Sequence, residues 1–271
     1  MCKETPYFYY LKLNKISEVS IHNNIISQLK TVKNSTEILN TKIAHYKDGA
    51  AFTKLILWLN EEIKTKELTE IQVYNKIDNI KKSIDTYKGN SFSSIVAVNK
   101  NAAFPHYDPL LSLPTNIDKN SILLIDCGGQ YLEGTTDTTR TLTFKEPSNE
   151  FKRFFTLTLK GLIALSSIKF PLNTPGRNLD VLARQFLWNE GLDYNHGTGH
   201  GVGHYLSVHE EPIRFNQICN TSLVEGMIIS IEPGFYQVNH FGIRIENLVV
   251  VQKVQNNDKF LELIPLTFYT Y

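Results

Sequence analysis

The chain reads ILLIDCGGQYLEGTTDTTR from Ile122 to Arg140, an apolar run that ends in one aspartate and is followed by a second. The four apolar residues predict a buried strand, and Asp126 follows them where a neutral side chain is expected. A carboxylate at such a position needs a compensating partner. If Gln130–Gly134 forms a hairpin turn, Asp126 and Asp137 lie almost opposite each other on paired strands.

A second pair of carboxylates follows the same pattern. Glu232 ends the apolar run that begins at Met227, and a hairpin centred near Asn239 brings Glu246 next to it. Directly opposed Cβ atoms lie about 4.5–5.5 Å apart, so two carboxylates there repel each other unless a cation lies between them. Metal ions about 3.5–4 Å apart fit this span. A single such carboxylate is more often a cap or a salt bridge, but two similar hairpins favour a two-metal site.

Histidines are concentrated between the two carboxylate pairs. His196, His200, His204 and His209 lie within fourteen residues of each other, with glycines interspersed. Imidazole is a common metal ligand and transfers protons near neutral pH. The glycines do not have the spacing of a dinucleotide-binding loop, and a zinc-peptidase helix motif is absent. Four carboxylates with one histidine favour Mn²⁺, Co²⁺ or Fe²⁺ over a structural zinc site, and hydrolysis by metal-activated water is the expected chemistry.

Composition excludes several other classes of protein. Lys and Arg number 28 against 27 Asp and Glu, so no net field favours nucleic acid or an anionic membrane. The three cysteines are too few and too dispersed for a disulfide framework. The N-terminus lacks the pattern of a signal peptide, and no apolar run is long enough for a membrane span. We therefore expect a cytoplasmic location.

Two helices are predicted before the first strand. A capping box at Asn34 and Glu37 opens a helix that runs to about Lys64. Its apolar positions at helical spacing are Ile43, Tyr46, Ala50 and Leu57. A second capping box at Thr69 and Gln72 opens a helix that we expect to end at Gly89. Its apolar stripe consists of Val73, Ile77, Ile80 and Ile84.

The rest of the chain alternates between strand-rich and helical segments. Strands are expected at 94–98, 122–126, 135–144, 227–232 and 243–252, and helices at 149–166 and 177–189. This order predicts an α+β fold with helices on one side of a largely antiparallel sheet. We expect one domain over residues 34–271, preceded at 1–33 by the remnant of another domain or an N-terminal extension.

Several motifs together give this chain a specific resemblance. They are Phe104-Pro105-His106-Tyr107, Ile125–Tyr131, Thr136–Thr141, His196–Gly203, Val208-His209-Glu210, Glu232-Pro233-Gly234 and Gly242–Asn247. In these motifs the chain resembles the "pita-bread" metallopeptidases, and within them the three-domain Xaa-Pro aminopeptidases (aminopeptidase P). The resemblance implies a curved, largely antiparallel sheet with flanking helices. It also implies cleavage of the bond between an N-terminal residue and a following proline, by a hydroxide that bridges two metal ions.

The resemblance also implies roles for individual residues. The implied metal ligands are Asp126, Asp137, His200, Glu232 and Glu246, with Asp137 and Glu246 bridging two divalent ions. Mn²⁺ is the expected metal, with Co²⁺, Zn²⁺ and Fe²⁺ as alternatives. Glu232 is the implied general base, and the implied substrate-site histidines are His106, His196 and His209. Arg244 either orients Glu246 or forms a surface ion pair. The implied partners are peptides with proline at position two and a second copy of the chain in a homodimer.

Other functions stay open on the sequence alone. A prolidase-type Xaa-Pro dipeptidase or a methionine aminopeptidase would use the same five ligands. A peptide-binding module of this fold that has lost its metal ligands is disfavoured, because all five are present. An inactive or partner-dependent fragment is the third alternative. Glu211, where the related peptidases usually have glycine, is expected to narrow or recharge the rim of the substrate site.

Overall fold

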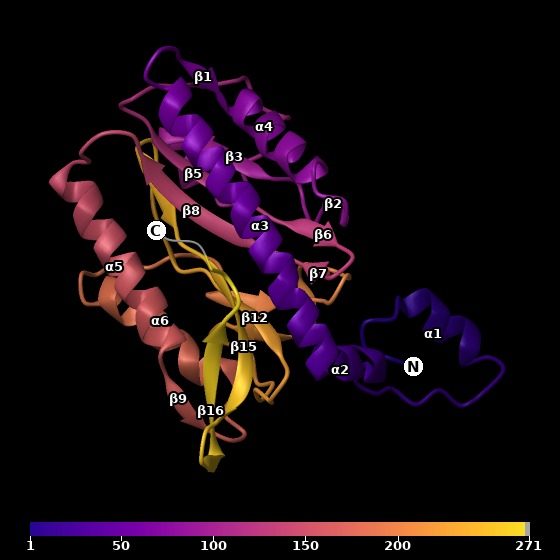
Figure 1. Ribbon diagram of the computed structural model, residues 1–271. Helices are drawn as coiled ribbons and strands as arrows, with labels where there is room; N and C mark the ends of the chain where they lie inside the picture. Colours follow the sequence, from indigo (N-terminus) through magenta and orange to yellow (C-terminus); the bar gives the residue numbers. More distant parts are fainter. Residues whose placement is uncertain (269–271) are drawn as a thin grey trace.

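The computed structural model describes residues 1–268 and contains two halves, each with a β-sheet covered by a pair of helices (Figure 1). The first half and the segment before it contain α1 (Tyr7–Leu13), α2 (Ile25–Thr31), α3 (Ser35–Glu62), β1 (Leu68–Thr69), α4 (Glu70–Lys82), β2 (Tyr87–Asn90), β3 (Ile95–Val98), the 3-10 helix η1 (Asn99–Ala103), β4 (Asn116–Ile117), β5 (Ile122–Cys127), β6 (Gly129–Tyr131), β7 (Gly134–Thr135) and β8 (Thr138–Thr143). The second half contains α5 (Asn149–Ser166), β9 (Lys169–Pro171), α6 (Gly176–Trp188), β10 (Gly199–Gly201), β11 (Glu210–Phe215), β12 (Ile228–Ile231), β13 (Gly234–Gln237), β14 (Phe241–Arg244), β15 (Asn247–Val254) and β16 (Asn257–Pro265).

Helix α3 begins at the predicted capping box, in which Asn34 and Glu37 each bond the other's backbone N–H. Its buried face differs from the predicted series: Ile43, Tyr46 and Leu57 are exposed. The residues that are buried on α3 are Thr41, Ala44, His45, Asp48, Gly49, Ala51, Phe52, Leu55 and Leu59. This face contains polar side chains that bond within the core, so apolar spacing alone pointed to the wrong side of the helix.

Helix α4 also begins at its predicted capping box, but it ends at Lys82 rather than at Gly89. Gly89 has a φ of 144° and pairs with Gln130 in the β2–β6 ladder, so this glycine lies in a strand. The first core lies between the helix pair α3 and α4 and the sheet with strand order β3-β5-β8 (Figure 1). Phe52, Val73 and Ile125 are among its buried side chains.

The second core lies between α5 and α6 and a six-stranded sheet with strand order β11-β10-β12-β15-β16-β9. Helix α5 has the predicted bounds and begins at Ser148, whose side chain accepts a hydrogen bond from the backbone N–H of Phe151. Every pairing between the named strands within residues 1–268 is antiparallel. The predicted α+β layout is therefore confirmed.

The N-terminal segment projects from one side of the molecule (Figure 1). None of the residues of α1 is buried. Helix α2 packs against β11, and Val32 forms a bridge with Met227, so this segment attaches to the second half through its last residues. Within residues 1–268, no helix combines the length and apolarity that crossing a membrane requires.

Candidate metal centre

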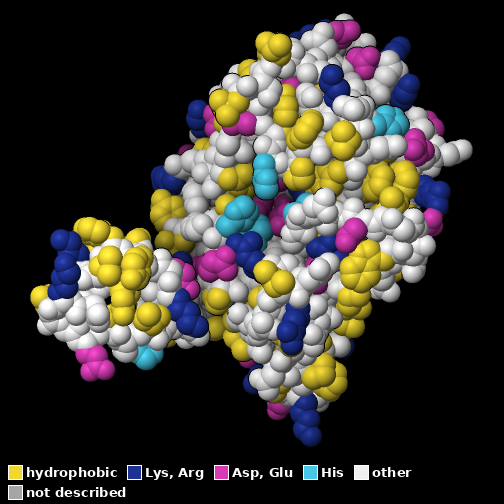
Figure 2. Space-filling view, turned by 180° about the vertical axis from the view of Figure 1, so that it is seen from behind, with side chains coloured by type: hydrophobic (Ala, Val, Ile, Leu, Met, Phe, Trp, Pro, Cys, Tyr) yellow, Lys and Arg dark blue, Asp and Glu magenta, His cyan; other side chains and the backbone are white. Residues whose placement is uncertain are grey.

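A cleft of about 410 Å³ opens between the two halves and is lined by all eight residues predicted for the site. Figure 2 shows histidine and acidic side chains gathered in the hollow between an upper and a lower lobe. The predicted residues that line it are His106, Asp126, Asp137, His196, His200, His209, Glu232 and Glu246. The fold therefore brings together side chains that are spread over more than half of the sequence.

Asp126 and Asp137 lie on the same face of the β5–β8 sheet, but they are offset. Asp126 pairs with Thr139, and Asp137 lies two residues before Thr139, so the aspartates are diagonal neighbours. The expectation that they lie almost opposite each other was therefore wrong by two residues. The cause is the position of the turn: Tyr131 pairs with Gly134, which leaves a two-residue loop. Gly134 adopts a φ of 146° and begins the return strand.

Glu232 and Glu246 lie opposite each other, as the predicted hairpin requires. On one side of them Gly234 pairs with Arg244 in β13–β14, and on the other Ile231 pairs with Asn247 in β12–β15. The two ladders share the same register around a turn at Asn239, and this register places Glu232 opposite Glu246. The hairpin prediction is confirmed.

The backbone N–H groups of these two glutamates do not pair with each other but donate to neighbouring segments of the chain. The N–H of Glu232 donates to Thr198 O at 2.7 Å, and the N–H of Glu246 donates to Thr139 O at 3.1 Å. These bonds draw β8 and the start of β10 toward the hairpin. Four chain segments thus converge on one point, which is why ligand-type side chains from both halves can meet there.

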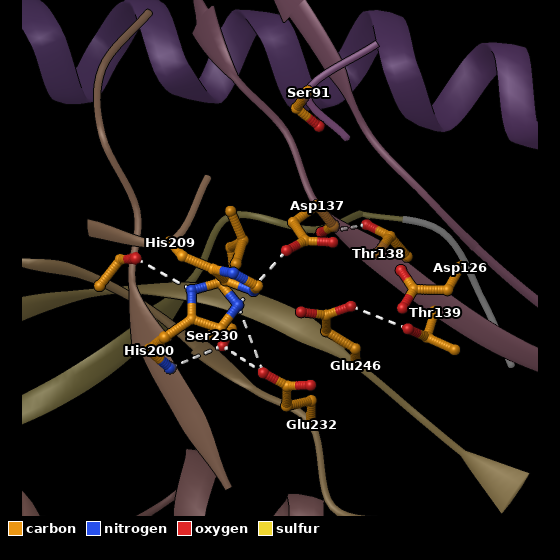
Figure 3. A network of polar contacts seen from close by, with 12 residues as sticks. Ser91, Asp126, Asp137, Thr138, Thr139, His200, His209, Ser230, Glu232 and Glu246 are labelled. Carbon is orange, nitrogen blue, oxygen red and sulfur yellow. Dashed lines mark hydrogen bonds and ion pairs between the residues drawn. The ribbon is translucent and has the colours of Figure 1, made fainter. Parts of the chain in front are cut away.

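The convergence is closest at Asp137, His200 and Glu246, each of which offers a ligand atom within 4.8 Å of the other two. His200 Nε2 lies 3.5 Å from Asp137 Oδ2 and 3.3 Å from Glu232 Oε1. Figure 3 shows these side chains pointing toward one another, with Asp126 beside Glu246 and Thr139. Five donors of the predicted ligand set therefore surround one small volume and could hold metal ions.

Among the described residues, Asp137 and Glu246 form no ion pair with a lysine or an arginine, and the His200 ring lies 3.5 Å from Asp137. Burial raises the pKa of Asp137 well above its usual range, and the Asp126 and Glu232 carboxylates raise it further. Burial raises the pKa of Glu246 well above its usual range in the same way, with Asp137 as the next cause. Among the described residues, no donor reaches Asp126 Oδ1 or Glu246 Oε1. Bound divalent cations would satisfy these oxygens and neutralise the charge.

The other two carboxylates have cationic or polar partners. Asp126 Oδ2 accepts a hydrogen bond of 2.7 Å from Arg244 Nη2; burial still raises the pKa of Asp126, although Arg244 opposes this effect. For Glu232 burial also acts to raise the pKa, but His200, His196 and Arg244 outweigh it and the pKa is lowered.

Arg244 itself corrects one expectation. It is buried and pairs with Asp126, so it forms no surface ion pair. It reaches Glu246 through Thr139, whose hydroxyl accepts a hydrogen bond from Arg244 Nε and donates one to Glu246. Its Nη1 also donates to the hydroxyl of Tyr236 at 2.9 Å. Arg244 therefore links the carboxylates of the first half to a strand of the second half.

The three predicted substrate-site histidines all line the cleft. His196 Nε2 and the Tyr236 hydroxyl share a hydrogen bond of 2.8 Å, and burial lowers the pKa of His196. The ring of His209 meets that of His200 edge-on, with centroids 4.1 Å apart, and burial lowers the pKa of His209 as well. His204 bonds Thr41 instead and is not among the residues that line the cleft.

Sequence reasoning missed several residues that support the site. Tyr236 contacts both His196 and Arg244, and Thr139 Oγ1 donates to Glu246 Oε2 at 2.9 Å. Arg184 Nη2 donates to His196 O at 2.7 Å. Thr139 lies within a motif that the sequence reading did single out, but Tyr236 and Arg184 carry no comparable signal.

The rim of the cleft carries an ion pair at the position where the sequence departs from the related peptidases. Glu211 pairs with Arg214, whose side chain lines the cleft. Arg214 pairs with His200 in the β10–β11 register, so both side chains point to one face of the sheet. Both expected effects, a narrower rim and altered charge, are compatible with this placement.

Comparison with known proteins identifies the family. The model of metallopeptidase family M24 matches residues 40–253. A probable Xaa-Pro aminopeptidase P of Paracoccidioides brasiliensis (strain Pb18) is 45% identical over 254 residues, which are 92% of this chain and 41% of that protein. One of Pyrenophora tritici-repentis is 46% identical over 240 residues, which are 87% of this chain and 40% of that protein. The chain thus spans about two fifths of the length of these relatives.

Solved structures agree in fold. An X-prolyl aminopeptidase from Caenorhabditis elegans, described as a cytosolic enzyme with a di-nuclear active site, has a TM-score of 0.88 and 40% identity. The match covers 92% of this chain and 41% of that one. A prolidase from Pyrococcus furiosus has a TM-score of 0.83 and 26% identity, over 99% of this chain and 75% of that one. The α+β pita-bread fold is confirmed. Because the family model covers most of its length, the chain belongs to metallopeptidase family M24.

Proposed function

We propose that this chain is the catalytic unit of an Xaa-Pro aminopeptidase, which cleaves the bond between an N-terminal residue and a following proline. The observation that carries the proposal is the convergence of four carboxylates and His200 in a cleft where two of the carboxyl groups need a cation. The choice of substrate rests on the relatives, which are named Xaa-Pro aminopeptidases.

Asp126, Asp137, His200, Glu232 and Glu246 would hold two divalent ions, with Asp137 and Glu246 between them. This donor set is dominated by hard oxygen ligands, and Mn²⁺ suits such a set, with Co²⁺, Zn²⁺ and Fe²⁺ as alternatives. Bound metal ions would lower the pKa of a coordinated water so that hydroxide is available near neutral pH.

The side chains around the metal ligands divide the remaining work. Glu232 is ionised near neutral pH because its pKa is lowered, so it can accept the proton of the attacking water. His196 is held by Tyr236 and is neutral, which suits it to orient the substrate carbonyl. His106 and His209 also line the cleft, where they can donate to the oxyanion and transfer protons.

Domain organisation, location and assembly are part of the proposal. Residues 34–271 would form the catalytic domain, and residues 1–33 a remnant or extension attached through α2. The cytoplasmic location and the homodimer stay predictions; the nematode enzyme is described as cytosolic.

The test is an assay of the purified, Mn²⁺-loaded chain on peptides that differ only at the second residue. We expect release of the N-terminal residue when proline is second, and little or none with alanine. Xaa-Pro dipeptides assayed beside longer peptides separate a dipeptidase from an aminopeptidase. Asp137→Ala serves as the control for contaminating peptidases. Hydrolysis that ignores the second residue, or none with any peptide, would contradict the proposal.

A further inference from the structure

A buried ion pair joins the N-terminal segment to the strand that follows His209. Lys33 Nζ donates to Glu210 Oε2, and the two side chains are 1% and 0% exposed. The same ammonium donates to Thr31 O at 3.1 Å, and Thr31 Oγ1 donates to Glu211 O at 3.2 Å. The backbone N–H of Lys33 donates to Gly226 O at 2.9 Å. Lys33 is thus fixed at both its main chain and its side chain.

Glu210 is the first residue of β11 and the immediate neighbour of His209. The side chain of His209 lines the cleft, whereas the buried side chain of Glu210 does not line it and bonds Lys33 instead. Glu210 also pairs with Gly201 in the β10–β11 register. Gly201 O in turn bonds His200 Nδ1 at 2.9 Å. The carboxylate of Glu210 therefore sits behind the place where the backbones that carry His200 and His209 meet.

Gly201 allows these two backbones to approach closely. A Cβ atom at Gly201 would lie 2.5 Å from Glu210 O, which no side chain tolerates without movement of the backbone. The backbone of Glu210 is thus packed directly against the strand residue that follows His200. Among residues 1–268, Lys33 is the cation that bonds this carboxylate, and Lys30 Nζ stays 3.8 Å from its other oxygen.

We infer that Lys33 is a positioning residue, which through Glu210 holds His209 in its place beside His200 at the mouth of the metal cluster. The inference deepens the proposed function, because it assumes that His209 acts on the substrate. It also makes the last residues before α3 part of the catalytic unit. A buried ion pair contributes little net stability compared with apolar side chains of similar size, so its specific value lies in the geometry that it imposes.

The experiment compares Lys33→Met with a matched variant in the other half of the molecule. Lys81 and Asp48 form a second buried ion pair, with side chains that are 0% and 1% exposed. The charge of Asp48 acts to raise the pKa of His45, so His45 serves as the reporter for this second pair. Lys33→Met and Lys81→Met each leave one buried carboxylate without its lysine. Histidine ring signals are recorded by ¹H–¹³C NMR on the metal-free proteins, and His209→Gln identifies the signal of His209.

We expect Lys33→Met to move the ring signal of His209 and to leave that of His45 in place, and Lys81→Met to do the reverse. On the Mn²⁺-loaded protein, Lys33→Met should lower kcat on an Xaa-Pro peptide by about 10- to 100-fold with an unchanged metal content. Glu210→Gln keeps the size of the side chain and one acceptor for Lys33. It should give a smaller effect in the same direction, and it replaces Lys33→Met if that variant does not fold.

Two results would overturn the inference. One is a His209 signal that stays in place in both Lys33→Met and Glu210→Gln. The other is a His209 signal that moves as far in Lys81→Met as in Lys33→Met. A wild-type chain that cleaves no Xaa-Pro peptide would refute the proposed function alone, since the ring signals still report whether the pair positions His209.

Discussion

The four carboxylates of the cleft differ in how their charge is compensated by the protein. Asp126 and Glu232, the outer pair, have partners: Arg244 bonds Asp126, and His200 and Ser230 contact Glu232. Asp137 and Glu246, the inner pair, form no ion pair with a lysine or an arginine of the described residues. Although His200 also lies 3.5 Å from Asp137, burial raises the pKa of each carboxyl group well above its usual range. The outer pair is compensated by side chains, whereas the inner pair is left to be compensated by a ligand.

This difference indicates where the metal ions contribute most. A carboxylate that already pairs with arginine loses part of its attraction for a metal, while an uncompensated one gains the full benefit of a cation. The inner pair is therefore expected to dominate metal binding and the outer pair to tune it. Removing one carboxylate from each pair tests this difference.

The largest expected effect follows from removing an inner carboxylate. In the proposed ligand set Asp137 binds both ions, so Asp137→Ala should lose both and hydrolysis should fall to background. Asp126 is proposed to bind one of the two ions, so Asp126→Ala should keep the other. Elemental analysis after Mn²⁺ loading and gel filtration measures this directly. Equal metal contents in the two variants would mean that the inner and outer carboxylates do not differ.

A second effect, on the stability of the metal-free protein, should differ in size between the two pairs. Asp137→Asn removes a buried charge that its neighbours repel, and should stabilise the metal-free fold by on the order of 1 kcal/mol. Asp126→Asn also removes a buried carboxylate whose pKa is raised, but Arg244 compensates that charge, so the gain should be smaller. Urea unfolding in the presence of a chelator measures both. An equal gain in the two variants would refute the distinction.

Much of the cleft could be predicted from the sequence because its carboxylates end apolar strands. Glu232 and Glu246 were placed correctly, since a hairpin register needs only the position of its turn. Asp126 and Asp137 were placed two residues out of register because the turn consists of Leu132 and Glu133 rather than of Gln130–Gly134. A register shift of two residues keeps both side chains on the same face of the sheet, so the prediction that both aspartates face one site was still correct.

Interactions between distant segments could not be predicted. Arg244 lies two residues from Glu246 in sequence but bonds Asp126, and Lys33 meets Glu210 across 177 residues. The face of α3 was misassigned for a related reason. Its core side includes Asp48, which is buried against Lys81 and Tyr131. A polar residue that finds its partner only in the folded state reads as exposed in the sequence.

The last predicted effect concerns a buried ionisable group that lies outside the cleft. His45 lies in the same core, and within the described chain neither of its ring nitrogens has a hydrogen-bond partner. Burial lowers the pKa of His45 from 6.5 to about 4, although Asp48 acts in the opposite direction. The unfolded chain therefore binds a proton at a higher pH than the folded protein does. The stability associated with neutral His45 is complete above pH 6.5 and is lost as the pH falls toward 4.

The variant His45→Leu removes this titration, so the free energy of unfolding should fall less steeply between pH 6.5 and 4 than in the wild type. The difference accumulated over this range should be on the order of 3 kcal/mol. Metal-free proteins are compared, because both then carry the same uncompensated inner carboxylates and the release of metal at low pH cannot contribute. The inner carboxylates can be neutralised by bound metal ions, whereas burial favours the neutral form of His45 itself. Parallel stability curves for the two proteins would show that His45 accepts its proton without cost in the folded state, and that burial without a partner does not by itself set the charge of a group in this fold.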